Sequence, residues 1–268
     1  MFSDGLALLF RPRVVVSDRP ATVSRVPLVA AAVCPHPPLL VPEIAAGAAP
    51  ELDDLRTACD AVVARLLASG ARRIAVVGSD EATREHVYPS WGSFAPWGVP
   101  IDAGLGDPDE ARRRGHSPLP LSLLVAAWLL GRRECTERPV SCSMLGVAGS
   151  ADPAECVRIG EAIDGAEPWA ILVMGDGSAC RGVKAPGYDD PRAQPYDDRV
   201  AEALAGADAN ALRDLDPELS ARLRVAGRAP WQVLAGAVTA TGDGWRGDLI
   251  YYAAPYGVAY FVASWEPA

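Results

Sequence analysis

Short apolar runs alternate with amphipathic stretches along most of this sequence. Residues 27–33, 73–77 and 169–174 are largely apolar runs of strand length, which are typical of strands buried on both faces of a sheet. Residues 51–68 instead carry apolar side chains at helical spacing, with acidic residues in the first turn, and stop at Ser69-Gly70. This order predicts a strand, a helix and a second strand joined by a right-handed parallel crossover.

The same alternation continues towards the C-terminus. Residues 140–147 predict another strand, and residues 249–252 and 258–264 predict a closing β-hairpin. The further helices expected are 119–130, 153–163, 197–205, 216–223 and 230–240. This pattern predicts one α/β domain over residues 27–268, with a mostly parallel central sheet flanked by helices. Residues 1–26 have no clear period, and we interpret them as an N-terminal extension that is disordered or results from an over-long start.

Composition and charge exclude several classes of protein. The chain has 268 residues, of which half are hydrophobic, as in ordinary globular proteins. Its net charge of −9 argues against broad binding to nucleic acid, because such binding needs many cations for the phosphates. The longest clean apolar run, residues 121–130, is too short for a membrane span of about 20 residues. We therefore expect neither a nucleic acid nor a membrane as partner.

Six cysteines are spread along the chain, and none form a C-x-x-C pair. They stand at positions 34, 59, 135, 142, 156 and 180. Zinc-ribbon and thioredoxin patterns are therefore absent. The N-terminus is also a poor signal peptide, because its apolar core is short and no basic residue precedes it. These features predict reduced thiols in a cytoplasmic protein.

Polar residues follow three of the predicted strands. His36 follows the first, Asp80 and Glu81 follow the second, and Asp176 and Ser178 follow the third. Because parallel strands bring such loops to one edge of a sheet, His36 could meet these carboxylates there. A histidine with carboxylates is a plausible set of ligands for Fe(II) or another divalent metal. Such residues at strand ends more often cap loops or face solvent.

Six segments together resemble the class III extradiol dioxygenase superfamily, which includes protocatechuate and DOPA dioxygenases and the Memo family. They are CPHPPLLVPEI (34–44), IAVVGSDEA (74–82), LPLSLLVAAWLL (119–130), LVMGDGSACRGVKAPGYDDPRAQPYD (172–197), VAGRAPWQVLAGAV (225–238) and APYGVAYFVA (254–263). The resemblance covers about residues 27–265, and the first and fourth segments are its most specific parts. It implies the fold of the catalytic subunit, and it implies a homodimer or a small partner subunit.

The resemblance also assigns roles to four positions. His36 falls on the first metal-ligand histidine, and Glu81 falls on the second. Ala179 stands where the family has its acid/base histidine, after a loop that contains Asp176. Ala226 falls on the third metal ligand, which is glutamate in the dioxygenases and cysteine in the Memo family. One ligand is thus kept, one is changed, and two functional positions carry alanine.

Two interpretations of function follow. Ring cleavage needs Fe(II) with open positions and a group that moves protons, and alanine supplies neither. We therefore expect no standard dioxygenase activity. The pocket formed by the loops at the strand ends would then bind a small aromatic or acidic ligand, or a metal. Otherwise the fold is kept for interaction and the pocket binds no ligand. The candidate residues are Asp176 and Ser178 in the catalytic loop, Asp80, Cys180 and Arg181 for the ligand, and His36 and Glu81 for the metal. The alternative is an active, divergent, metal-dependent oxidoreductase that uses His36 and Glu81.

Other residues near these loops could contribute to the site. His86 could swing in as a replacement imidazole, although a surface position is the simpler interpretation. Trp91, Phe94 and Trp97 could wall a pocket or pack on the sheet edge. Both alternatives stay open at the level of the sequence.

Overall fold

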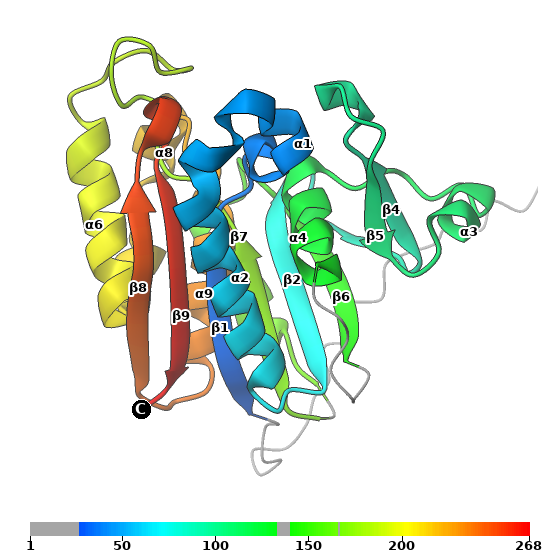
Figure 1. Cartoon of the computed structure of the whole chain (residues 1–268). Coiled ribbons are helices and arrows are strands. Elements are labelled where there is room, and N and C mark those ends of the chain that lie inside the picture. Colours follow the sequence, from blue (N-terminus) through cyan, green and yellow to red (C-terminus); the bar gives the residue numbers. More distant parts are fainter. Residues whose placement is uncertain (1–26, 133–139, 166) are drawn as a thin grey trace, which may run out of the picture.

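A seven-stranded sheet forms the centre of the structure (Figure 1). The computed structural model describes residues 27–132, 140–165 and 167–268. The strand order is β3-β6-β2-β7-β1-β9-β8, in which β6, β2, β7 and β1 run parallel and the other three run antiparallel to their neighbours. The predicted fold class, one α/β domain with a mostly parallel central sheet and flanking helices, is confirmed.

The elements have the following bounds. The strands are β1 (Leu28–Cys34), β2 (Arg73–Asp80), β3 (Arg84–His86), β4 (Ser90–Ser93), β5 (Asp102–Leu105), β6 (Ser141–Ala148), β7 (Trp169–Met174), β8 (Trp245–Ala253) and β9 (Tyr260–Pro267). The helices are α1 (Pro42–Ala45), α2 (Asp53–Ala68), α3 (Pro108–Arg113), α4 (Leu121–Gly131), α5 (Pro153–Ala162), α6 (Ala193–Gly206), α7 (Ala209–Arg213), α8 (Pro217–Arg222) and α9 (Arg228–Thr239). Strands β4 and β5 pair only with each other and stand apart from the main sheet (Figure 1).

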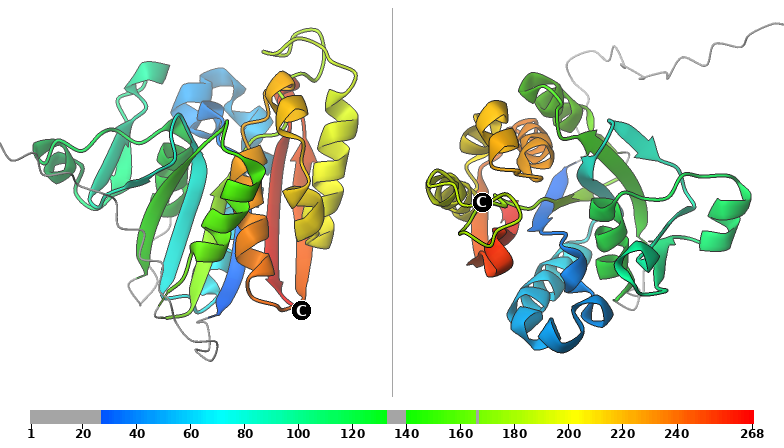
Figure 2. Two further views of the ribbon diagram at one scale, coloured as in Figure 1. Left: turned by 180° about the vertical axis from the view of Figure 1, so that it is seen from behind. Right: turned by 90° about the horizontal axis from the view of Figure 1, so that it is seen from above.

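Helices cover both faces of the sheet, and each face has its own apolar core. Helices α2 and α4 pack on one face of the sheet (Figure 1). Leu55, Val62 and Leu123 are buried there. Helices α9 and α6 cover the other face, and α5 packs along α9 (Figure 2). Trp231 and Phe261 are buried in that second core. Burial on both faces explains why the parallel strands are continuous apolar runs.

The parallel strands end at one edge of the sheet, which we call the carboxyl edge. Cys34 of β1 and Gly78 of β2 both pair with Met174, the last residue of β7. The loops after β1 and β7 therefore begin at the same level, and β2 continues beyond it. This register places His36 and the loop that begins at Gly175 next to each other.

Two element boundaries differ from the sequence prediction in ways that matter for the site. Residues 78–80 were expected in a loop, but they extend β2, because Gly78, Ser79 and Asp80 pair with β6. Helix α6 begins at Ala193 rather than near position 197. Pro195 is tolerated in its first turn because an N–H there needs no partner inside the helix.

Several short elements were not expected, namely β3, β4, β5, α1, α3 and α7. Each has six residues or fewer, which is too short for a periodic pattern to identify. Among the described residues, none of the helices is both long and apolar enough to cross a membrane. The expected extension 1–26 and Cys135 lie outside the described residues.

Candidate functional site

His36 and Asp176 meet at the carboxyl edge, where the loops after β1 and β7 lie side by side. The backbone N–H of His36 donates a 2.7 Å hydrogen bond to Oδ1 of Asp176. The same oxygen lies 3.5 Å from Nδ1 of the imidazole, and the two side chains are only 7% and 15% exposed. The N–H of Gly175 donates to the carbonyl of Cys34 at 2.9 Å and ties the loops together. His36 and Asp176 therefore lie together at this edge, as the order of strands and loops predicts.

The pair lies in a poorly solvated environment. Burial raises the pKa of Asp176, and the neighbouring His36 only partly offsets this, through its charge and its backbone hydrogen bond. Nδ1 of His36 is buried and has no hydrogen-bond partner in the described structure. A buried polar atom without a partner is costly, and a role in a functional site is one of the reasons for which such an atom is kept.

The two alanine positions lie in two segments that are hydrogen-bonded to each other beside Asp176. The N–H of Gly227, which follows Ala226, donates to the backbone carbonyl of Asp176 at 2.8 Å. The N–H of Ala179 donates to the carbonyl of Leu223 at 2.9 Å. Both alanines are half-buried, so the 176–179 loop and the 223–227 turn pack against each other. Their methyl groups supply neither a metal ligand nor a proton.

Ser178 and Arg181 are held in a buried polar network. The Ser178 hydroxyl and N–H donate to the two oxygens of Asp197, at 2.5 and 2.9 Å. Arg181 donates to Asp197, Tyr252 and Gln194 at 3.2, 3.1 and 2.7 Å. Burial raises the pKa of Asp197, against the opposing effect of these hydrogen bonds. These contacts hold the loop after β7 against α6. They also occupy the Arg181 guanidinium, which was expected to bind the ligand, and the Ser178 hydroxyl, which was expected in the catalytic loop.

The candidate cysteine is also enclosed. Cys180 is buried, and its Sγ lies 3.4 Å from the carbonyl of Gly187 and 3.5 Å from that of Leu223. Burial raises the pKa of Cys180, which disfavours the reactive thiolate. Cys34 is buried against Cys59, whose pKa is raised by burial and by a hydrogen bond with Cys34. These thiols are placed as core residues.

A second polar cluster lies at the end of β2. Oδ2 of Asp80 is 2.9 Å from Nε2 of His86 and 3.0 Å from Nε of Arg84. Oδ1 accepts from the backbone N–H of Glu81 at 2.7 Å and from Nη2 of Arg84 at 3.3 Å. Burial raises the pKa of Asp80, but these hydrogen bonds outweigh it and leave the pKa below its usual value. His86 thus lies on β3 and binds Asp80, and Arg84 belongs to the same cluster although no sequence pattern marks it.

The structure does not gather the proposed metal ligands. The side chain of Glu81 is exposed, whereas His36 is buried. Within residues 27–132, 140–165 and 167–268, no group of three or more His, Cys, Asp or Glu residues is placed to hold a metal ion. Of the carboxylates expected to meet His36, Asp176 is the one that the structure places in contact with it. The donor set does not fit an Fe(II) centre, which takes two histidines and a carboxylate.

A cavity of about 450 Å³ opens at the carboxyl end of β2. It is lined by Ser79, Asp80, Glu81, Arg84, Pro118, Pro120 and Leu121. We call it the β2-end cavity. Asp80 and Glu81 are the predicted site residues that it contains. Its volume lies in the range of small-molecule sites.

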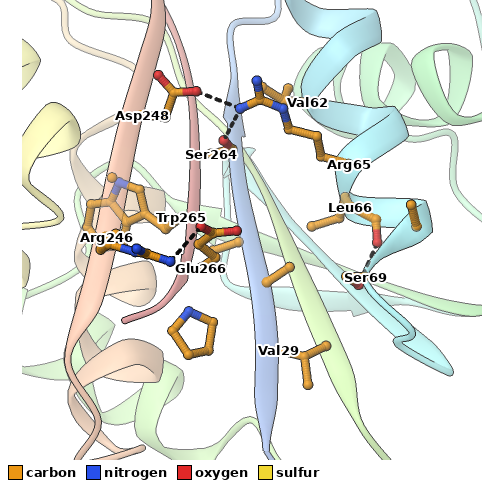
Figure 3. Close-up of a pocket in the computed structure, with 15 residues that line it drawn as sticks. Val29, Val62, Arg65, Leu66, Ser69, Arg246, Asp248, Ser264, Trp265 and Glu266 are labelled. Carbon is orange, nitrogen blue, oxygen red and sulfur yellow. Dashed lines mark hydrogen bonds and ion pairs between the residues drawn. The ribbon is translucent and has the colours of Figure 1, made fainter.

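A larger cavity of about 980 Å³ lies away from this edge, between α2 and strands β8 and β9 (Figure 3). Its arginines already have acidic partners. Arg65 donates to Asp248 at 2.6 Å and to Ser264 at 3.0 Å, and Arg246 donates to Glu266 at 3.1 Å (Figure 3). None of the residues expected in the site lines this cavity, so we do not assign it to the predicted function.

The aromatic residues after β2 mainly serve packing. Phe94 is fully buried in the core beneath α2 and α4, and its ring lies 6.1 Å from that of Trp97. The guanidinium of Arg112 lies 4.2 Å above Trp91. None of the three lines the β2-end cavity. Of the two alternatives, packing describes their contacts.

Comparisons with known proteins leave the function open. No protein-family model matches the sequence, and no curated protein matches it. Among solved structures, the chain is similar to the crystal structure of an uncharacterized protein, JW3007, from Escherichia coli K12. The identity is 11%, the match covers 89% of this chain and 99% of that chain, and the TM-score is 0.43. We base no assignment on this similarity.

Proposed function

We propose that this protein binds a small ligand at the carboxyl edge of its sheet and does not cleave catechol rings. In this proposal it is a divergent member of the class III extradiol dioxygenase superfamily. The observation that carries the proposal is the composition of the edge around Asp176. His36 and Asp176 are in contact there, but the neighbouring positions are Ala179 and Ala226. One imidazole and one carboxylate do not make a site for Fe(II) with open positions.

The β2-end cavity supports the ligand-binding part of the proposal. It opens at the same edge, and it presents Arg84 beside Glu81 and the buried Asp80. Convergent polar groups in a concave site of this size are the usual basis for binding a small molecule. A metal is not needed for that role.

The first test measures iron binding and oxygen consumption. The protein and its His36→Ala variant are loaded anaerobically with Fe(II), desalted and analysed for iron. Oxygen uptake is then followed with catechol and with protocatechuate. We expect substoichiometric iron and no uptake above buffer for both proteins. Iron near one per chain and oxygen uptake, both lost in His36→Ala, would instead establish the active oxidoreductase.

The second test locates the ligand. Backbone amide spectra of the iron-free protein are recorded with protocatechuate, a small aromatic acid. We expect shifts of the amides of Glu81, Arg84 and Leu121, which surround the β2-end cavity. Shifts confined to other surfaces contradict the proposed site.

We also propose a cytoplasmic location. Cys34, Cys59, Cys156 and Cys180 are free thiols in the structure, which suits a reducing compartment. The homodimer implied by the resemblance remains a proposal as well, and light scattering of the purified protein tests it.

A further inference from the structure

The β2-end cavity offers a ligand one accessible cation and one accessible anion. The Arg84 side chain is 48% exposed, and Glu81 is exposed. Asp80 also lines the cavity, but its side chain is only 2% exposed and its oxygens are already hydrogen-bonded. The charges that a ligand can reach are therefore those of Arg84 and Glu81.

Arg84 is held in a fixed orientation. Its Nε and Nη2 donate to the two oxygens of Asp80, at 3.0 and 3.3 Å. Asp80 is itself fixed by His86 and by the N–H of Glu81. Nη1 of Arg84 has no partner among the described residues. A guanidinium held in this way can donate to a ligand carboxylate with little further loss of entropy.

The first turn of α4 adds to the positive side of the cavity. Leu121 begins this helix and lines the cavity, and the preceding Pro120 provides no side-chain cap. The first N–H groups of a helix have no carbonyl partner within it, and they favour negative charge. Arg84 and this helix end would therefore act together on one anionic group.

Glu81 supplies the opposite charge at the cavity. Its backbone N–H is tied to Asp80, and its carboxylate makes no ion pair with any described residue. The rest of the lining includes the apolar side chains of Pro118, Pro120 and Leu121. The cavity thus combines a cationic side, an anionic side and an aliphatic wall.

We propose that the β2-end cavity binds an aliphatic zwitterion, with its carboxylate on Arg84 and the first turn of α4 and its ammonium on Glu81. The aliphatic part of the ligand packs against Pro118 and Leu121. A cavity of about 450 Å³ accommodates a molecule of amino-acid size. The inference rests on the proposed function, since it names the ligand class of that site.

The test uses three probes that share one aliphatic group: leucine, isocaproate, which lacks the ammonium, and isoamylamine, which lacks the carboxylate. Their affinities for the iron-free full-length protein are measured by titration calorimetry and by amide shifts. We expect leucine to bind at least about ten-fold more tightly than either analogue, because it alone satisfies both charges.

Two variants separate the two ends of the ligand. Glu81→Gln should weaken leucine binding to the level of isocaproate and leave isocaproate unchanged. Arg84→Gln should weaken it to the level of isoamylamine. Glu85→Gln is the matched control for the first, since Glu85 is exposed on the same segment but does not line the cavity. Arg246→Gln, which breaks an exposed ion pair elsewhere, is the control for the second.

The outcomes distinguish this inference from the proposed function. If isocaproate binds as tightly as leucine, or if Glu81→Gln has no effect on leucine binding, the proposal of a zwitterionic ligand is overturned. Ligand binding at the β2-end cavity then still stands. Leucine binding that neither variant changes also overturns the inference. If none of the three probes and no protocatechuate shifts the amides of residues 79–84, both the inference and the proposed site fail.

Discussion

The backbone N–H of His36 and the carboxylate of Asp176 form a 2.7 Å hydrogen bond between residues 140 positions apart. This bond links the loops after two adjacent parallel strands, β1 and β7. The carboxylate acts here as an acceptor from the backbone, and the imidazole Nδ1 remains unpaired at 3.5 Å. The contact can therefore persist when the charge of Asp176 is removed.

The Asp176→Asn variant should gain stability relative to wild type as the pH rises. Burial raises the folded-state pKa of Asp176 above its unfolded value. Asp176 therefore contributes its full stabilisation when the pH is below its pKa in the unfolded chain. This stabilisation is lost as the pH rises through its pKa in the folded protein. Asparagine keeps an acceptor for the His36 N–H and does not titrate. Urea unfolding of both proteins from about pH 4 to pH 7 measures the difference.

The exposed Asp243→Asn variant provides the baseline for that comparison. The free energy of unfolding of Asp176→Asn minus that of wild type should rise with pH. If this difference is constant or falls as the pH rises, burial does not disfavour the charged form of Asp176 in the folded protein.

The sheet could be predicted from the sequence because its strands are buried on both faces. Residues 169–174 form an uninterrupted apolar run, and in the structure every one of them is buried. Helix α2 was identified for a related reason, since its apolar positions follow the helical period over four turns. The polar end of β2 was missed because Ser79 and Asp80 lack such a pattern and are held in the strand by pairing with β6.

The site was harder to predict, because its contacts join residues that are distant in sequence or lie on very short elements. The histidine at the β1 end and the carboxylate of Asp176 were found, since both follow strongly apolar strands. His86 reaches Asp80 only because β3, three polar residues long, turns back along β6. Arg181 was expected to bind a ligand, and no local pattern reveals that Asp197 and Tyr252 take up its donors.

Replacing Asp197 should strongly destabilise the protein. Its carboxylate is fully buried, and it accepts hydrogen bonds from Ser178 and Arg181. The Asp197→Ala variant leaves a mostly buried guanidinium and a buried hydroxyl without this acceptor, which should cost about 3 kcal/mol. Ser178→Ala, which removes one donor, should cost about 1 kcal/mol.

Chemical denaturation measures both changes, and Asp190→Ala is the control. Asp190 pairs with Arg192, whose side chain is half exposed, so its loss should matter much less. Equal effects of Asp190→Ala and Asp197→Ala would contradict the assignment of the Asp197 network as an anchor for the loop after β7.

Arg228 should contribute to stability through hydrogen bonds to carbonyl groups rather than through an ion pair. It is 2% exposed, and it donates to the backbone carbonyls of Gly149 and Ala151 and to Gln232. Arg228→Met keeps most of the volume but leaves these acceptors unpaired, at a cost of about 2 kcal/mol. Arg224→Met is the control, because Arg224 is exposed and donates to one carbonyl, that of Pro186. If the free energies of unfolding of Arg228→Met and Arg224→Met agree within error, the hydrogen bonds of Arg228 do not stabilise the protein as proposed.

The contact between α5 and α9 should depend on the absence of a side chain at Gly160. A Cβ built at this position would lie 2.0 Å from the carbonyl oxygen of Val233 and 2.6 Å from the amide nitrogen of Ala237. Both are backbone atoms, so a methyl group can be accommodated only if the two helices move apart. Overpacking of this kind typically costs 1–3 kcal/mol, and we expect Gly160→Ala to lie at about 3 kcal/mol.

Gly131→Ala is the matched control, because Gly131 is also helical and a Cβ there meets nothing within 4 Å. Alanine is the better helix former, so this variant should be neutral or slightly stabilising, by less than about 1 kcal/mol. Thermal and urea unfolding compare the two variants directly. If Gly160→Ala is as stable as Gly131→Ala, helices α5 and α9 do not approach each other as closely as these distances indicate. The core that contains Trp231 is then packed more loosely than described.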